Sequence, residues 1–279
     1  MIFYIALILF TAMQSIFTKR SGKSGENNQC FQLLKALSAL IVFGAVILIK
    51  GGSFNSKTIL YGMVSGIVLS CSNYTGYRAL KSGPMGLTSA VVAFSLIVPV
   101  IYGVVFLNEV LTYKSFIAFV LIISAILLIN KVGSERSNLS LSWWIFVVAT
   151  LLLNGIYSVI QKQHQVEFPG EMRAEFMVVS MAVCTIIFFT AHCIHILKKQ
   201  SSGKKKIFNG AASGVSNGMV GFLTLYLSST QQASVMFSVI SVCTVIAALL
   251  SGRIIFKERV SLKQMIGVAC GVVAVVLLK

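Results

Sequence analysis

The sequence predicts an all-α integral membrane protein in which ten transmembrane helices form two inverted five-helix repeats. The first observation is composition: of 279 residues, 57% are hydrophobic and only 11% are charged, too little charge to cover a soluble domain. The second is the recurrence of apolar runs near the roughly 20 residues that cross a bilayer core. The third is a residue pattern in the first half that returns in the second. Together they exclude a soluble cytosolic or secreted enzyme.

Apolar runs bounded by charge, glycine or proline define the expected helices, which are 1–18, 31–49, 58–77, 84–108, 113–129, 142–161, 174–197, 207–227, 233–256 and 262–278. The connectors between them are too short for a soluble domain, so the function is expected within the membrane. The first run is interpreted as a span and not as a signal peptide, because Lys19 and Arg20 follow it instead of preceding it. The six cysteines include no C-x-x-C pair and are expected to be buried as small hydrophobic residues.

The distribution of positive charge predicts the orientation. The chain has 23 Lys and Arg against 7 acids, and the basic residues concentrate in the odd-numbered connectors. The positive-inside rule places those connectors in the cytoplasm and both termini outside, so the net charge of +16 does not indicate nucleic-acid binding. The Lys-rich connector 198–206 is interpreted as part of this topology signal, with an anionic-lipid site as the alternative. Trp143 and Trp144 are expected in an interfacial aromatic belt.

The two halves, 1–137 and 138–279, are predicted to be repeats. The segment from Glu109 to Ala118 returns from Glu258 to Gly267, with a Lys five residues after each Glu. Other matches relate the first span to the sixth and the third to the eighth: Thr11, Gln14, Ser15, Thr18 and Lys19 correspond to Asn154, Tyr157, Ser158, Gln161 and Lys162, and Gly62, Gly66 and Ser70 to Gly210, Gly214 and Gly218. The glycine series predicts close helix contact. Because each repeat holds an odd number of spans, the second must be inverted.

At these residues the chain resembles the ten-span EamA-like branch of the drug/metabolite transporter (DMT) superfamily. The matching features are a Lys that closes the first helix of each half (Lys19, Lys162), the run Tyr77-Arg78-Ala79-Leu80 followed by Pro99, and Glu-x-hydrophobic-Thr/Ser before each last helix. The resemblance implies a carrier that moves small organic metabolites or drugs by alternating access, without a prosthetic group. It also implies cytoplasmic termini, the alternative to the orientation that the charges predict.

The polar residues on span faces are the candidate solute-binding residues. They are Gln14, Asn73, Tyr74, Tyr77, Asn154, Tyr157, Gln161, Asn217, Tyr226, Ser238 and Ser241. The alternative interpretation is that they only form hydrogen bonds between helices. Lys35, one turn inside the second span, is added as a possible partner for an anionic group, with snorkelling to the interface as its alternative.

The acidic residues argue against a proton-coupled cation exporter. The sequence contains no Asp, and its Glu residues fall in connectors or at span ends. The solute is therefore expected to be neutral, zwitterionic or anionic, moved by facilitated diffusion or exchange. Glu109 and Glu258 are expected to be structural, either capping the following helix or pairing with Lys114 and Lys263.

No catalytic motif, cofactor motif or metal site is expected. His192 and His195 lack a third ligand with suitable spacing, and no cluster of nucleophile, acid and histidine points to an enzyme. The expected partners are a small-molecule solute and the lipid bilayer, in a monomer or homodimer in the cell (plasma) membrane, and no nucleic acid. The alternative function is a membrane scaffold or receptor that transports nothing, because polar stripes also hold helices together.

Overall fold

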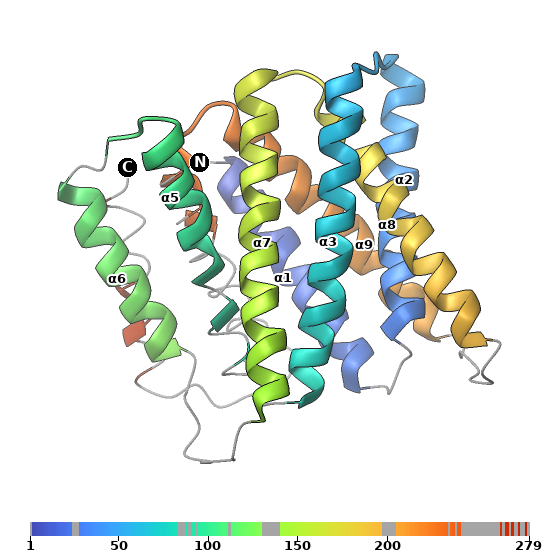
Figure 1. The fold of residues 1–279 in the computed structure, drawn as a ribbon, viewed down its shortest axis with the longest axis horizontal. Coiled ribbons are helices and arrows are strands. Elements are labelled where there is room, and N and C mark those ends of the chain that lie inside the picture. The colour runs from blue at the N-terminus through green and yellow to red at the C-terminus, as the bar shows by residue number, and fades with distance from the viewer. Residues whose placement is uncertain are drawn as a thin grey trace. The chain divides into compact units, whose positions relative to one another are not determined.

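A computed structural model describes residues 2–23, 28–82, 88, 91–92, 94–110, 113–129, 140–196, 205–233, 235–237 and 239–240, with scattered positions between 263 and 277. In these residues the chain forms helices joined by short turns and contains no strand. The helices are α1 (Ile2–Lys23), α2 (Asn28–Lys50), α3 (Ser56–Ser82), the short 3-10 helix η1 (Phe94–Leu96), α5 (Ile97–Phe106), α6 (Tyr113–Ile129), α7 (Leu141–Glu167), α8 (Arg173–Ile196) and α9 (Lys205–Ser228) (Figure 1).

The chain is a membrane protein. Among the described residues, three helical stretches are long and apolar enough to cross a bilayer: Gln29–Ile49, Leu141–Glu167 and Arg173–Ile194. Two shorter apolar helices cover Phe3–Thr18 and Phe94–Phe106. In a bilayer a helix satisfies all of its backbone hydrogen bonds internally, which is why such apolar segments adopt this structure.

Two of the residues with positive φ follow the ends of α2 and α5. Gly51 follows α2 with φ of +71°, which is the left-handed conformation that glycine adopts at little cost after a helix. Asn108 has φ of +52° two residues after α5, and here the backbone N–H of Glu109 donates to the carbonyl of Gly103 at 3.0 Å. This turn places the Glu109 side chain next to the last turn of α5.

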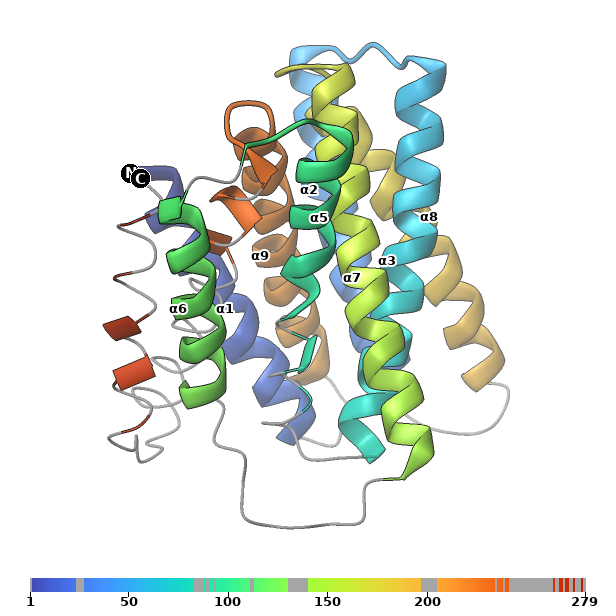
Figure 2. The ribbon, with the colours of Figure 1, turned by 60° about the vertical axis from the view of Figure 1, so that its left-hand side comes forward.

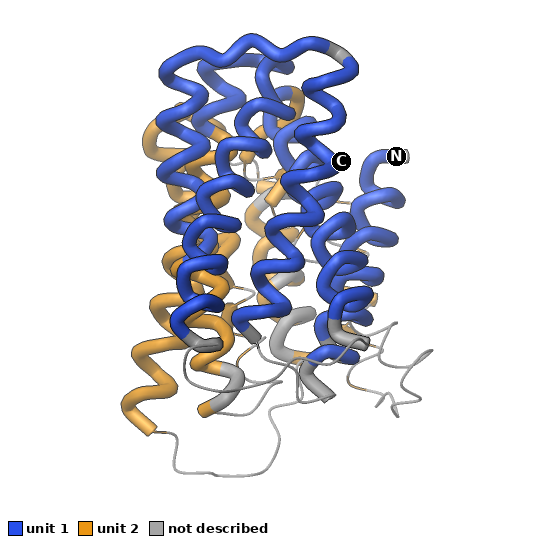
Figure 3. Tube along the Cα trace, turned by 90° about the vertical axis from the view of Figure 1, so that its right-hand side faces the viewer, with its two compact units in different colours: residues 1–70, 163–229 blue, residues 71–162, 230–279 orange. Residues whose placement is uncertain are grey.

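The described chain divides into two compact units, coloured separately in Figure 3. Unit 1 contains residues 1–70 and 163–229, and unit 2 contains residues 71–162 and 230–279. Each unit therefore takes segments from both expected repeats. Helix α3 belongs to unit 1 up to Ser70 and to unit 2 from Cys71 onward.

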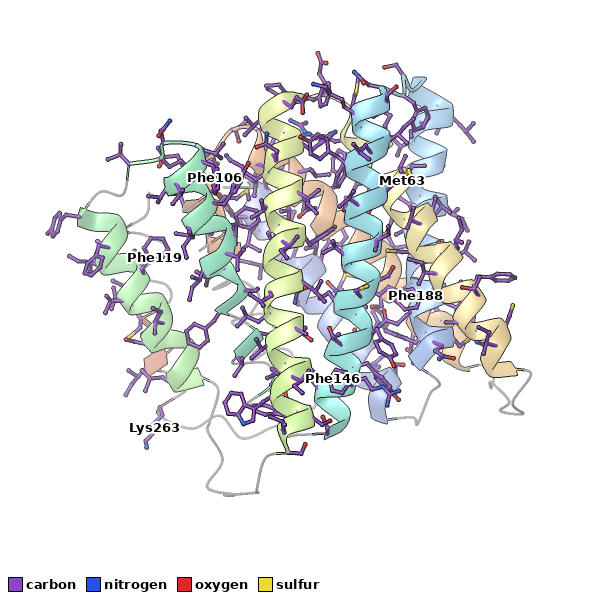
Figure 4. All side chains as sticks on the ribbon, in the orientation of Figure 1. Met63, Phe106, Phe119, Phe146, Phe188 and Lys263 are labelled. Carbon is purple, nitrogen blue, oxygen red and sulfur yellow. The ribbon has the colours of Figure 1, made fainter. Side chains whose placement is uncertain are left out.

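In unit 1, α2 packs against both α8 and α9, and α1 packs against α9. The views in Figures 1 and 2 both show α1 beside α9. Part of the hydrophobic core lies between α2 and α8, where Ala36, Cys184 and Phe188 are buried with Leu33 and Leu69 packed against them. Phe188 is labelled on α8 in Figure 4.

Both predicted glycine series make close helix contacts in unit 1. On α3, a Cβ at Gly62 would lie 2.7 Å from Cβ of Val179, and one at Gly66 would lie 2.6 Å from the carbonyl oxygen of Ser180. The third member of this series, Ser70, donates to Sγ of Cys184 at 3.2 Å. The prediction of close contact is confirmed for this series, which packs on α8.

The second glycine series, on α9, packs on α2. A Cβ at Gly210 would lie 2.7 Å from Cβ of Leu34. Gly214 lies against the backbone carbonyl of Lys35 and the hydroxyl of Ser38, and Gly218 against Ala39. Only the absence of a side chain allows these two helices to approach so closely.

In unit 2, α7 carries the core. Trp143 and Val147 are buried with Ala79, and Val91, Val92 and Phe146 pack against them. The indole N–H of Trp143 donates to the hydroxyl of Thr88 at 3.0 Å. The expectation that Trp143 belongs to an interfacial belt is therefore wrong, because its ring is fully buried and its polar atom has an internal partner. Trp144, which is 47% exposed, is free to occupy an interface.

Candidate functional site

A polar face of unit 1 joins α1 and α9. The side-chain amide of Gln14 donates to Oδ1 of Asn217 at 2.9 Å, and the hydroxyls of Thr18 and Ser213 lie 3.4 Å apart. Each pair is one helical turn from the other on both helices, so the two contacts form a short ladder between them. The structure thus brings together two of the predicted site residues, Gln14 and Asn217, from opposite halves of the sequence.

Tyr226, a third predicted residue of unit 1, contacts both an aromatic ring and a cation. Its ring centroid is 4.4 Å from that of Phe3 on α1, and the guanidinium carbon of Arg173 lies 4.7 Å from the same centroid. Arg173 also donates to the hydroxyl of Ser229 at 2.7 Å and to Oε1 of Gln165 at 3.1 Å. These bonds hold Arg173 over the tyrosine face, an arrangement typical of a cation–π contact.

His164 is a buried polar residue that sequence reasoning missed. Its side chain is fully buried, its Nε2 lies 3.2 Å from the Thr58 hydroxyl, and its Nδ1 lies 3.0 Å from the Gln165 amide. The ring also contacts Phe176 at a centroid distance of 4.7 Å. The surrounding sequence is polar throughout, with Gln-Lys-Gln-His-Gln at 161–165. Such a run is typical of a solvated helix end, and nothing in it indicates that His164 is buried.

Near this cluster, an exposed ion pair joins Lys57 to Glu167, which also accepts a hydrogen bond from the hydroxyl of Tyr61 at 3.0 Å. The hydrogen bond to Glu167, followed by the negative charge of that carboxylate, raises the pKa of Lys57. Lys57 therefore stays protonated throughout the physiological pH range.

Lys35 lies in α2, and its side chain is 8% exposed. Its backbone carbonyl lies against Gly214 of α9. No ion pair between Lys35 and a carboxylate occurs among the described residues. Both expectations for Lys35, a role toward an anionic group and snorkelling to the interface, stay predictions.

In unit 2, α3 and α7 form a second polar face. The hydroxyl of Ser72 donates to Oδ1 of Asn154 at 2.8 Å, and one turn along each helix the hydroxyl of Thr150 donates to that of Thr75 at 2.9 Å. Asn154, a predicted residue, is thus bonded across the helix pair. Its neighbours Tyr157 and Gln161 bond to each other along α7 at 3.2 Å.

The remaining predicted residues of α3 lie on a more open surface. Tyr74 is 45% exposed, and its hydroxyl accepts hydrogen bonds from Arg78 at 2.9 and 3.1 Å. Tyr77 is 38% exposed and Asn73 is half-buried. The predicted residues Ser238 and Ser241 lie outside the described residues.

Unit 2 also contains a buried ion pair between Glu109 and Lys162. Their charged atoms are 3.8 Å apart, and each side chain is 7% exposed. Oε1 of Glu109 also accepts a hydrogen bond from the backbone N–H of Ala233, at 2.6 Å. The expectation that Glu109 caps the following helix stays a prediction, because residues 111 and 112 lie outside the described residues. The expected partner Lys114 and the expected pair Glu258–Lys263 include side chains outside the described residues. Glu109 is far from both Lys162 and Ala233 along the sequence, so no local pattern indicates this contact.

Comparison with known proteins places the chain in a family of transporters. The family described as "Sugar transport protein" matches residues 1–278. A solved structure, described only as a crystal structure of a protein, has a TM-score of 0.78 at 15% sequence identity, covering 99% of this chain and 97% of its own. At that identity the likeness shows the fold alone. No curated protein matches the chain.

Proposed function

Because the chain belongs to the family of sugar transport proteins, we propose that it is a secondary transporter that carries a small neutral sugar across the membrane by alternating access. The observation that carries this proposal is the uncharged polar face of α1 and α9, where the amides of Gln14 and Asn217 meet. Neither helix contains an acidic residue, and their basic residues lie at the helix ends. Amides and hydroxyls can donate to and accept from sugar hydroxyls without the cost of burying a charge.

Tyr226 supports the same solute class. Its ring, which contacts Phe3 and Arg173, adds an aromatic surface to α9, the helix that carries Asn217. Binding sites for small molecules combine apolar and aromatic surface with a few polar groups that fix orientation. We place Gln14, Asn217 and Tyr226 in the solute site, and Asn154, Tyr157 and Tyr77 as candidates for its counterpart in unit 2.

The reciprocal packing in unit 1 supports two inverted repeats, 1–137 and 138–279, with ten spans in total. Gly62 meets Val179 and Gly66 meets Ser180, while Gly210 meets Leu34 and Gly214 meets Lys35. One constant offset along the chain relates the two glycines of α3 to those of α9, and another relates Leu34 and Lys35 to Val179 and Ser180. Contacts that are exchanged in this way are what a two-fold axis produces. An axis in the membrane plane is the basis of alternating access in inverted-repeat carriers.

Purified protein and proteoliposomes test the proposal. A neutral sugar that binds the folded state should raise the melting temperature, and the same sugar in labelled form should enter proteoliposomes in a saturable manner. A panel of aldohexoses, aldopentoses and their acids identifies the class. Binding without flux would favour a receptor, whereas no response to any neutral sugar in either measurement would overturn the proposal.

We also infer facilitated diffusion or exchange as the mode of transport. The sequence contains no Asp, and Glu109, at the end of a span, is already paired with Lys162. A protonophore should therefore leave the initial rate of sugar uptake unchanged when no pH gradient is imposed. Accumulation of sugar against its own gradient, driven by an imposed pH gradient, would contradict this inference.

A further inference from the structure

The Glu109–Lys162 ion pair connects three segments of unit 2 that are distant in sequence. Glu109 lies in the turn after α5, Lys162 lies near the end of α7, and the backbone of Gln231 and Ala233 follows α9. Oε1 of Glu109 accepts from the N–H of Ala233 at 2.6 Å, and Nζ of Lys162 donates to the carbonyl of Gln231 at 2.5 Å. A single cluster of one carboxylate, one ammonium and two backbone groups therefore holds all three segments.

The local structure makes room for this cluster. A Cβ at Gly103 would lie 2.7 Å from Oε2 of Glu109 and 3.1 Å from Cβ of Ala233. The carbonyl of Gly103 also accepts the backbone N–H of Glu109. Glycine at this position thus allows the carboxylate to lie against α5 while it bonds to Ala233, which is fully buried.

The energetics of a buried ion pair favour a switching element over a simple brace. Two apolar side chains of similar volume often stabilise a fold as well as a buried pair does, whereas removal of one partner is strongly destabilising because it leaves a buried charge uncompensated. The intact pair therefore adds little net free energy to the closed state, whereas the loss of either charge destabilises that state strongly.

The position of the pair in the chain is also suited to a moving part. The chain passes from one compact unit to the other between Lys162 and Gln163 and again between Ser229 and Thr230. Lys162 and Gln231 are thus next to the two crossing points. Domain motions are absorbed by a few residues at the ends of elements or in loops.

We propose that Glu109 and Lys162, with the backbone of Gln231 and Ala233, form a latch. It keeps unit 2 closed at the end where α5 and α7 terminate, and it opens once in each transport cycle. The proposal rests on the proposed function, because a transport cycle requires the end to open. Glu109 and Lys162 act as positioning residues and need not touch the solute.

Thiol labelling tests the latch without any solute. In a cysteine-free background in nanodiscs, Ala233→Cys reports opening at the latch, and Ala79→Cys, which is equally buried in unit 2, reports general loosening. Glu109→Gln keeps the oxygen that accepts from residue 233 but removes the charge. We expect it to raise the rate of maleimide labelling at position 233 by roughly tenfold or more, and to leave position 79 unchanged.

The paired variants make the result specific. Lys162→Met should accelerate labelling as Glu109→Gln does, and the double variant should accelerate it less than the two single effects combined, because no uncompensated charge remains. Equal acceleration at positions 233 and 79 would mean general destabilisation and would overturn the latch. Unchanged labelling at both positions would overturn it as well.

A second experiment connects the latch to transport. In the double variant Glu109→Cys and Lys162→Cys, cross-linking with a bifunctional methanethiosulfonate reagent should stop sugar uptake, and reduction should restore it. Uptake that continues in the cross-linked protein would show that the latch stays closed throughout the cycle and would contradict the proposal. Absence of sugar uptake by the protein with both Glu109 and Lys162 intact would refute the proposed function, while the labelling result would still decide whether the latch opens.

Discussion

Gly214 of α9 lies directly against the backbone of Lys35 on α2, so that a Cβ at this position would be 2.8 Å from the carbonyl carbon of Lys35. The helix pair can approach this closely only because the glycine has no side chain. The equivalent contact, with the two expected repeats exchanged, is that of Gly66 with Ser180. These two contacts make the packing of α2, α3, α8 and α9 sensitive to the smallest substitution.

We predict that Gly214→Ala and Gly66→Ala each destabilise the protein by about 1 to 3 kcal/mol, because the added methyl group overlaps backbone atoms that cannot move aside. Gly44→Ala is the control, since a Cβ at Gly44 in α2 meets nothing within 4 Å. Thermal unfolding in detergent measures all three. A melting temperature for Gly214→Ala equal to that of Gly44→Ala would contradict the packing described here.

The Gln14–Asn217 pair should be needed for transport and only modestly for stability. An interhelical hydrogen bond in a membrane protein contributes on average about 0.6 kcal/mol, so Gln14→Ala and Asn217→Ala should fold. Each should reduce sugar uptake by roughly tenfold or more, because an unmatched sugar hydroxyl loses its partner. Thr224→Ala, whose hydroxyl donates to the carbonyl of Val220 on its own helix, serves as the control. Normal uptake by both amide variants would move the site elsewhere.

For the second polar face, we predict that Asn154→Ala and Tyr77→Ala abolish flux while folded protein remains in the membrane. Ser72→Ala distinguishes binding from packing, because it removes the recorded partner of Asn154 and leaves the amide in place. If Asn154 contacts the solute, Ser72→Ala retains most of the uptake that Asn154→Ala loses. Equal loss in both variants would indicate that the bond between α3 and α7 is the important feature.

Trp143 should anchor the core of unit 2. Thr88→Val removes the acceptor of the indole N–H and leaves a buried donor unsatisfied, which costs about 1 to 3 kcal/mol. The expected result is a lower melting temperature with unchanged sugar affinity. Thr190→Val, at an exposed position where the hydroxyl donates to carbonyls of its own helix, is the matched control. A shift no larger than that of the control would show that the Trp143–Thr88 bond contributes little.

The exposed Lys57–Glu167 pair should contribute little at any physiological pH. The pKa of Lys57 is raised in the folded state, so any stabilisation is fully present at neutral pH and is lost only as the pH rises through that raised value. Surface ion pairs contribute little because solvent screens them. Lys57→Ala should therefore leave the melting temperature unchanged between about pH 6 and pH 9. A decrease in melting temperature that varies with pH in that range would contradict a raised pKa of Lys57.

Local sequence patterns predicted correctly those features that depend on one helix at a time or on spacing along it. The glycine series on α3 and α9 implied close contacts, and both series make them. Reasoning failed for Trp143, because an aromatic pair at the start of a span looks the same whether it faces lipid or a buried Thr88. The burial of His164 was missed for the same reason, because it depends on which neighbouring helix covers that side of α7.

The sequence by itself determined that this protein is a helical membrane protein, because hydrophobicity and length fix what can cross a bilayer. That it is a transporter follows from the family match over residues 1–278. Only the tertiary structure decided the partners: Gln14 with Asn217, Ser72 with Asn154, and Glu109 with Lys162 and Ala233. Each of these contacts joins residues far apart along the chain. The energy of such a contact depends on the distance and burial of both groups, and neither quantity is encoded in the spacing of residues along one helix.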